Sequence, residues 1–227
     1  MQLKGQSSSN PGAWVKLKPA SGDSILKRLR SCGRHLNGTD WMEYDALDDD
    51  ELLYLSLEAI KGERDAEAVA LLKVLSGRSP GNPLAHYLLA AQHAQAGLLD
   101  RAEQGFRRAV ALAPEFAMAR FQLGQLMLVK GDGAAAAHEF RAVRSDDPAV
   151  AHYAEGLCAL AEDRLADALG ALRQGLALPQ AIPALAQDMQ RLVGATGVSV
   201  LPAEQEDDDV VSLTVAPMLL SNYNRYN

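Results

Sequence analysis

Histidine, cysteine, aspartate and glutamate carry most enzyme and metal chemistry, and this 227-residue chain has five histidines and two cysteines. His86 and His93 lie seven residues apart in a stretch of helical pattern, and His152 follows in a later stretch. A zinc site needs three or four ligands within reach of one ion, and these spacings do not supply them. We interpret the three histidines as helix-packing residues and predict no metal site.

Other catalytic patterns are missing from the sequence as well. It contains no phosphate-binding glycine loop, no dinucleotide-binding pattern and no cysteine–histidine metal spacing. The acidic run at residues 45–51 lacks the glycine and the ligand spacing of a calcium loop. Cys32 and Cys158 are interpreted as small apolar fillers, not as a disulfide framework. We predict no catalytic residue, no cofactor and no enzyme activity, because the segments outside the repeat described below are too short for a catalytic domain.

A repeat with a period of about 34 residues determines where most side chains of this chain lie. Pro80, Pro114 and Pro148 keep this spacing. Three further sets share it: Ala68, Ala102 and Ala136; Gly97 and Gly131; Phe106 and Phe140. A fixed period of this length is typical of proteins built from stacked structural repeats.

The copy at residues 83–116 shows what each repeat forms. Its first half carries apolar residues at helical spacing and ends at Gly97, a residue suited to a helix C-terminus. Its second half places Ala102 and Phe106 on one face, and Pro114 stops the helix. Each copy is therefore predicted to be a helical hairpin. One hairpin cannot bury its apolar face alone, so the copies must stack.

The unit resembles the tetratricopeptide repeat (TPR). The copy at residues 117–150 carries that family's Leu123–Gly124 pair, whereas Ser56 replaces the small residue in the copy at 49–82. The copy at 149–182 starts two residues early and keeps three matching residues: Gly156, Ala168 and Leu172. The resemblance implies an all-α, TPR-like right-handed superhelix of about four helical hairpins plus a C-terminal capping helix, with flexible N- and C-terminal tails.

We predict three segments: a flexible basic N-terminal segment at residues 1–47, a TPR domain at 48–194 and a C-terminal tail at 195–227. The first has one short helix at 23–32, and its Trp41 and Tyr44 are expected to pack on the first repeat. The repeats are placed at about 49–82, 83–116, 117–150 and 149–182, with the capping helix at 182–194. Individual helices are expected at 49–61, 65–77, 83–96, 99–112, 117–130, 133–145, 149–162, 165–176 and 182–194.

The C-terminal tail changes character along its length. Residues 204–209 contain five acids in six positions, a composition typical of solvated, disordered segments. Residues 210–220 are apolar and β-prone, and an exposed segment of that kind favours association. It could fold back onto the repeats, pair with another chain or bind a partner, and the sequence does not choose among these.

In the TPR family the second, fifth, ninth and twelfth residues of each repeat face a concave groove. The fifth positions here carry large apolar or aromatic side chains, which suit the binding of a peptide. The predicted partner-binding groove consists of Leu53, Leu57, Leu84, Tyr87, Met118, Phe121, Gln125, Leu128, Tyr153 and Leu157. Gln95 and Gln125 offer amides for hydrogen bonds to a peptide backbone. The competing interpretation is that some of these residues belong to the core.

These observations favour a protein–protein interaction scaffold or adaptor that holds an apolar peptide segment. TPR proteins that clamp a C-terminal carboxylate have Lys, Asn and Arg where this groove is apolar, so an acidic C-terminus is not the expected ligand. The alternatives are a bacterial secretion-system-type chaperone and a self-assembling subunit, a homo-oligomer that associates through its apolar tail. The net charge of −7 argues against general nucleic-acid binding. With no apolar run of about 20 residues and no signal region, we predict no membrane span and a cytoplasmic location.

Overall fold

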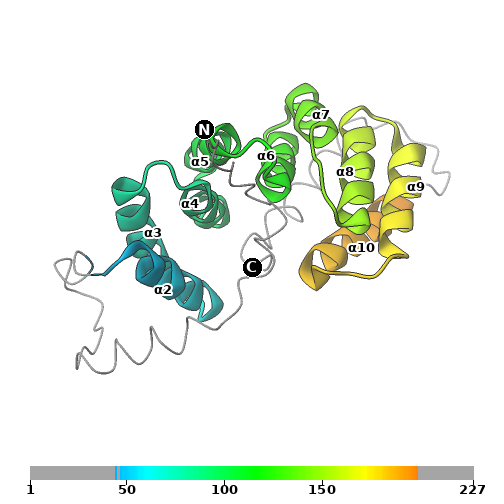
Figure 1. The fold of residues 1–227 in the computed structure, drawn as a ribbon. Helices are drawn as coiled ribbons and strands as arrows, with labels where there is room; N and C mark the ends of the chain where they lie inside the picture. Colours follow the sequence, from blue (N-terminus) through cyan, green and yellow to red (C-terminus); the bar gives the residue numbers. More distant parts are fainter. Residues whose placement is uncertain (1–43, 45–46, 199–227) are drawn as a thin grey trace, which may run out of the picture. The chain divides into compact units, whose positions relative to one another are not determined.

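The structure is a computed structural model that describes Tyr44 and residues 47–198. The predicted short helix at 23–32, Cys32, Trp41 and the tail at 199–227 lie outside the described residues. Within the described part the chain is all-α, with nine helices and no strand. The helices are α2 (Asp49–Lys61), α3 (Asp65–Arg78), α4 (Pro83–Gln95), α5 (Leu99–Leu112), α6 (Ala117–Val129), α7 (Gly133–Arg141), α8 (Pro148–Ala161), α9 (Leu165–Leu176) and α10 (Pro183–Val198) (Figure 1).

Side-chain caps begin several of these helices. Asp48 and Glu51 form a reciprocal capping box at the start of α2, which satisfies two backbone N–H groups that a helix terminus leaves unpaired. Asn82 and Asp147 cap α4 and α8, and each is followed by a proline at the first helical position. Three of the four first helices, α2, α4 and α8, therefore carry a side-chain cap, whereas α6 begins without one.

The turn inside each hairpin has one residue with a left-handed backbone. These residues are Glu63, Gly97, Gly131 and Asp163, with φ of 55°, 73°, 78° and 57°. They keep the repeat's spacing, with the last interval shortened by two residues. Glycine adopts this backbone without steric cost, and it occupies the two central turns. The two outer turns use acidic residues and carry some backbone strain.

Within each of the last two hairpins a glycine on the first helix faces a large residue on the second. A Cβ added to Gly124 of α6 would lie 2.8 Å from the ring of Phe140 in α7. A Cβ added to Gly156 of α8 would lie 2.7 Å from the side chain of Leu172 in α9. The absence of a side chain therefore lets the two helices approach until the larger residue fills the space between them.

The shorter spacing of the last copy originates in α7. This helix was expected to reach residue 145 but ends at Arg141, and an irregular segment leads to α8. Pro148 was predicted to end the third copy as Pro114 ends the second. It is instead the first residue of α8, where its missing N–H costs nothing and its fixed φ suits a helix start. The third proline of the pattern therefore starts a helix, although it keeps the spacing of the other two.

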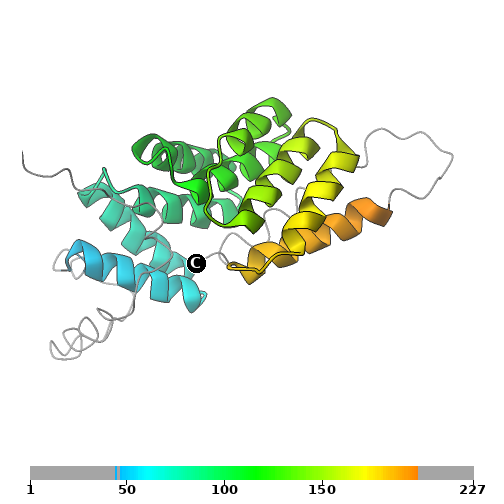
Figure 2. The same ribbon diagram turned by 45° about the vertical axis from the view of Figure 1, so that its right-hand side comes forward.

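The two ends of the described domain are closed by different elements. At the start, the Arg78 side chain of α3 donates hydrogen bonds to the backbone carbonyls of Tyr44 and Leu47, which ties the preceding segment to the first hairpin. At the other end α10 packs against α9 and continues to Val198, four residues past its predicted end (Figure 2). Its Leu185, Met189 and Leu192 are buried.

Candidate functional site

Of the histidines singled out from the sequence, His86 and His152 lie on different helices and contact different groups. The His86 ring nitrogen Nε2 lies 3.0 Å from the carbonyl oxygen of Pro80. His152 Nδ1 lies 3.5 Å from a carboxylate oxygen of Glu155. Among the described residues, no group of three or more histidine, cysteine, aspartate or glutamate side chains could hold a metal ion.

The contact made by His86 is part of the repeat. Arg120 stands one repeat length after His86, and its Nε donates over 2.7 Å to the carbonyl of Pro114, the repeat equivalent of Pro80. In both hairpins a side chain of the first helical turn thus ties down the loop that precedes the helix. The sequence analysis missed this pair, although the shared spacing of both partners was a usable signal.

The three aromatic residues of the predicted groove pack inside the hairpins. Tyr87 is 2 % exposed and lies with its ring 5.9 Å from Phe106 and 4.9 Å from Phe116. Phe121 is fully buried, with its ring 5.7 Å from that of Phe140. Burial raises the pKa of the Tyr87 hydroxyl, because the charged form would lose its hydration.

Tyr153 is also buried, but its hydroxyl group has a partner. The hydroxyl donates a hydrogen bond of 2.7 Å to Gln180, whose amide nitrogen donates to the carbonyls of Gly175 and Leu178. The ring fills the space beside Gly175, where an added Cβ would lie 2.6 Å from it. This tyrosine therefore holds the loop that follows α9.

Burial corrects half of the predicted groove. Five of its ten members have side chains in the interior: Tyr87, Phe121, Gln125, Tyr153 and Leu157. The rings of Tyr87 and Phe121 already pack against other aromatic rings, and that of Tyr153 packs against α9, so these three are wrong as accessible anchors for a partner. The other five are partly exposed and remain a predicted surface: Leu53, Leu57, Leu84, Met118 and Leu128.

Helix α6 carries the most unusual polar residues of the domain. Every residue from Phe121 to Met127 is buried. Gln122 and Gln125 lie one turn apart within this run, both fully buried. Neither the amide nitrogen nor the amide oxygen of either side chain has a hydrogen-bond partner. Gln125 was predicted as a backbone-binding amide, whereas Gln122 was missed, although a second glutamine in an apolar run was the available signal.

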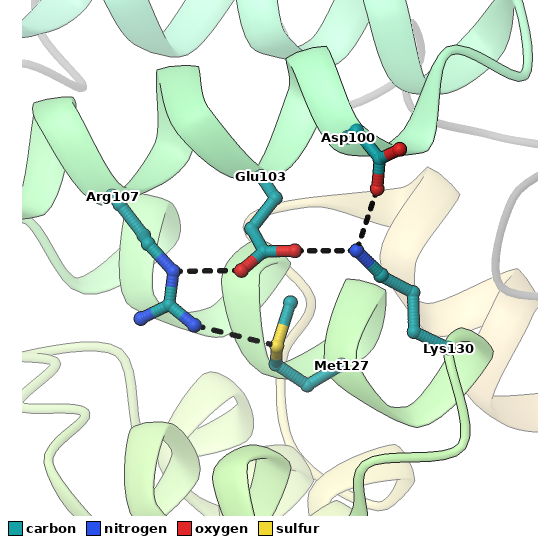
Figure 3. A network of polar contacts seen from close by, with 5 residues as sticks. All are labelled: Asp100, Glu103, Arg107, Met127 and Lys130. Carbon is teal, nitrogen blue, oxygen red and sulfur yellow. Dashed lines mark hydrogen bonds and ion pairs between the residues drawn. The ribbon is translucent and has the colours of Figure 1, made fainter.

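A charged network joins α5 to α6 (Figure 3). Lys130, the C-cap residue of α6, donates a hydrogen bond of 2.8 Å to Asp100 and one of 2.6 Å to Glu103. Glu103 also accepts a hydrogen bond of 2.8 Å from Arg107, whose guanidinium lies 3.9 Å from the sulfur of Met127. The hydrogen bonds from Lys130 lower the pKa values of both carboxyls, and Arg107 contributes further at Glu103.

The next junction has the opposite charge at the same C-cap position, and its partner is the repeat equivalent of Arg107. The C-cap residue of α8 is Glu162, and it pairs with Arg141 of α7. Glu162 also accepts a hydrogen bond from Arg164, which in turn forms an ion pair of 2.6 Å with Asp167. The corresponding C-cap of α4 is the uncharged Ala96. The two later junctions between hairpins therefore have an electrostatic connection at a position where the first has an alanine.

One further hollow lies between α8 and α9, with a volume of about 380 Å³. Its lining combines small residues with polar side chains, among them Glu155, Arg164 and Gln174. Arg164 is already paired within the network described above. This hollow therefore does not offer an unpaired charge from that arginine to a ligand.

Comparison with known proteins shows the fold of this domain and no more. No protein-family model matches the chain, and no curated protein matches it. Its structure is similar to that of a solved chain described as "MamA RS-1 ArsTM double mutant", a TPR-like protein, with a TM-score of 0.52 and 20% sequence identity. The match covers 76% of this chain and 92% of that one. The described domain therefore has a TPR-like fold, as the repeat predicted. None of the described helices is long and apolar enough to span a bilayer.

Proposed function

We propose that this chain is a non-catalytic protein-interaction scaffold that binds an apolar, extended segment of a partner protein on the first helices of its hairpins. The TPR-like fold supports the proposal, because stacked helical hairpins present an extended surface along the stack. The observation that carries it is a set of partly exposed apolar side chains at repeat-equivalent positions. Leu84 and Met118 are each the second residue of their helix, one repeat length apart.

The chemistry of these positions suits an uncharged ligand. The partly exposed set contains only leucine and methionine: Leu53, Leu57, Leu84, Met118 and Leu128. Burial of apolar side chains against such a surface drives association, and the absence of a cation in the set disfavours a free carboxylate. Among the described residues, Leu98 is the one large hydrophobic residue classed as exposed, at 43%. It is the N-cap residue of α5, in the turn that follows α4, and is not a member of this set.

The test is capture of a partner by the full chain, followed by titration. Wild type and a Met118→Glu, Leu128→Glu variant would be compared in lysate of the source cell, and the captured protein would then be purified. We expect the variant to bind it at least about tenfold more weakly, because each glutamate places a charge in an apolar contact. Leu98→Glu is the matched control and should bind like wild type.

Two results would overturn the proposal. One is equal affinity of wild type and the Met118→Glu, Leu128→Glu variant for the purified partner. The other is a loss of affinity in the Leu98→Glu control that matches the loss in the variant. Circular dichroism must show that all three proteins are equally helical. The identity of the captured protein would separate an adaptor from a secretion-system chaperone.

A further inference from the structure

Four residues of α6 share one stripe of the helix: Met118, Gln122, Gln125 and Val129. Their spacing of four, three and four residues places them one above another. The outer two are partly exposed and the two glutamines are fully buried. Other directions around α6 are taken by α7 of the same hairpin and α5 of the preceding one, since Gly124 faces Phe140 of α7 and Met127 lies beside an arginine of α5.

The glutamines on this stripe leave four buried amide atoms without partners. Buried polar groups in folded proteins are almost always hydrogen-bonded, so an unpaired pair of amides indicates a missing partner. A glutamine amide donates through its nitrogen and accepts through its oxygen, as a peptide group does. Two of them one helical turn apart therefore match the alternating N–H and C=O groups of an extended chain.

The chain itself contains a segment with the required chemistry. Residues 210–220, VVSLTVAPMLL, are uncharged, β-prone and rich in branched side chains. Val210 is twelve positions after Val198, the end of α10, and twelve extended residues span up to ~40 Å. Helix α6 contacts α8, α8 contacts α9 and α9 contacts α10, so three packing steps of ~8–10 Å each separate α6 from α10, a distance within that reach. A tethered segment also has a millimolar effective concentration at a nearby site.

We propose that residues 210–220 bind in cis to the stripe of α6 that carries Gln122 and Gln125, with their backbone paired to the two amides. The inference rests on the proposed function, because Met118 on this stripe belongs to the partner surface. The tail then competes with the partner protein, and the partner must displace it. The binding surface of the scaffold is then regulated by residues 210–220 of the same chain.

Hydrogen exchange of the full chain, read by mass spectrometry, tests this directly. In wild type we expect the amides of residues 210–220 to exchange at least about tenfold more slowly than in a Gln122→Met, Gln125→Met variant. Methionine keeps the volume of glutamine and removes the amide, so the variant can stay folded. Gln95→Met, at the exposed end of α4, is the matched control and should keep the protection. Equal exchange in wild type and the variant would overturn the inference.

A tail-side variant, Leu213→Asp with Val215→Asp, leaves α6 unaltered and should also abolish the protection. A labelled synthetic peptide with the sequence of residues 210–220 should then bind this variant at least about tenfold more tightly than it binds wild type. Equal affinities, measured by fluorescence anisotropy, would contradict docking in cis. A second contradicting result would be that dilution removes both the protection of these amides and a dimer seen in light scattering. That result would mean that the segment of one chain binds to another chain.

The two proposals can fail separately. An unprotected tail in a chain whose partner still depends on Met118 and Leu128 overturns the tail inference alone. A protected tail in a chain whose partner binds independently of those residues overturns the proposed function alone.

Discussion

At the scale of single residues, the domain depends on small side chains that face large ones. Replacing Gly124 by alanine puts a Cβ 2.8 Å from the buried ring of Phe140, so the ring or the helix must shift. We expect Gly124→Ala to lower the free energy of unfolding by ~1–3 kcal/mol, the usual cost of overpacking. Urea denaturation monitored by circular dichroism measures this change in the free energy of unfolding.

The matched control for this substitution is in α9. A Cβ added to Gly170 would meet no atom within 4 Å, and the residue is helical. Gly170→Ala should therefore stabilise the protein by ~0.5–1 kcal/mol, because alanine is the better helix former. The same chemical change would have opposite signs at two helical sites. Equal effects at both would mean that α6 and α7 are not in close contact.

The aromatic residues offer a second prediction at this scale. Tyr87 is buried against Phe106 and Phe116, so Tyr87→Ala should remove core packing and cost ~3–5 kcal/mol of unfolding free energy. Thermal and urea unfolding measure the loss. A Tyr87→Ala protein that keeps wild-type stability but loses its partner would restore the original assignment of this residue to the groove.

The sequence predicted which residues recur but not which way they point. Periodicity identified Tyr87 and Phe121 as equivalent, and they are buried in corresponding hairpins. A helix direction is normally read from its polar face, but in α6 the polar residues Gln122 and Gln125 are buried together with every other residue from Phe121 to Met127. Because these polar residues do not mark a solvent-facing side, inward and outward positions could not be distinguished from the sequence.

At the scale of helices, spacing and caps were sufficient to place most boundaries. The first helices α2, α4 and α6 begin one repeat length apart, as predicted. The predicted helix ends are wrong where tertiary packing determines the boundary, as at the early end of α7 and the later end of α10. Pro148 shows why: a proline both stops one helix and starts another, and the sequence alone does not say which.

The contact between α5 and α6 predicts a dependence of stability on pH. Asp100 and Glu103 have lowered pKa values in the folded chain because Lys130 donates to them. A lowered folded-state pKa stabilises the protein above the unfolded pKa, near 4, and this stabilisation is lost as the pH falls through the folded value. Lys130→Met should lower the melting temperature at pH 7, and the difference from wild type should shrink as the pH falls below about 4.

An exposed pair within α2 provides the control for this prediction. Lys61 donates to Glu58 over 2.9 Å but links no second helix, and its side chain is 63% exposed. Exposed pairs of this kind contribute little to stability. Lys61→Met should therefore leave the melting temperature nearly unchanged at both pH values. A Lys130→Met difference that persists unchanged at low pH would show that the network in Figure 3 does not stabilise the junction.

At the scale of the whole described domain, packing is local in sequence. Substantial contacts join each helix to the next along the chain, with α6 and α8 as the one additional pair. Stability in such an arrangement is a sum over neighbouring units, so the last unit needs a cover for its outer apolar side. Helix α10 supplies that cover at the C-terminal end through Leu185, Met189 and Leu192, each at most 1% exposed.

Removing this cover should convert the domain into a self-associating one. Met189→Asp buries an unpaired carboxylate against α9, so α10 would separate from it, at a cost of at least ~2–5 kcal/mol from lost packing alone. The exposed α9 surface would then pair with another molecule, and light scattering should show a mass that rises with concentration. Gln190→Asp, one residue further and exposed, should stay at the mass of wild type. A Met189→Asp protein with unchanged mass and melting temperature would mean that α10 does not seal the stack, and that the repeat ends without a cap.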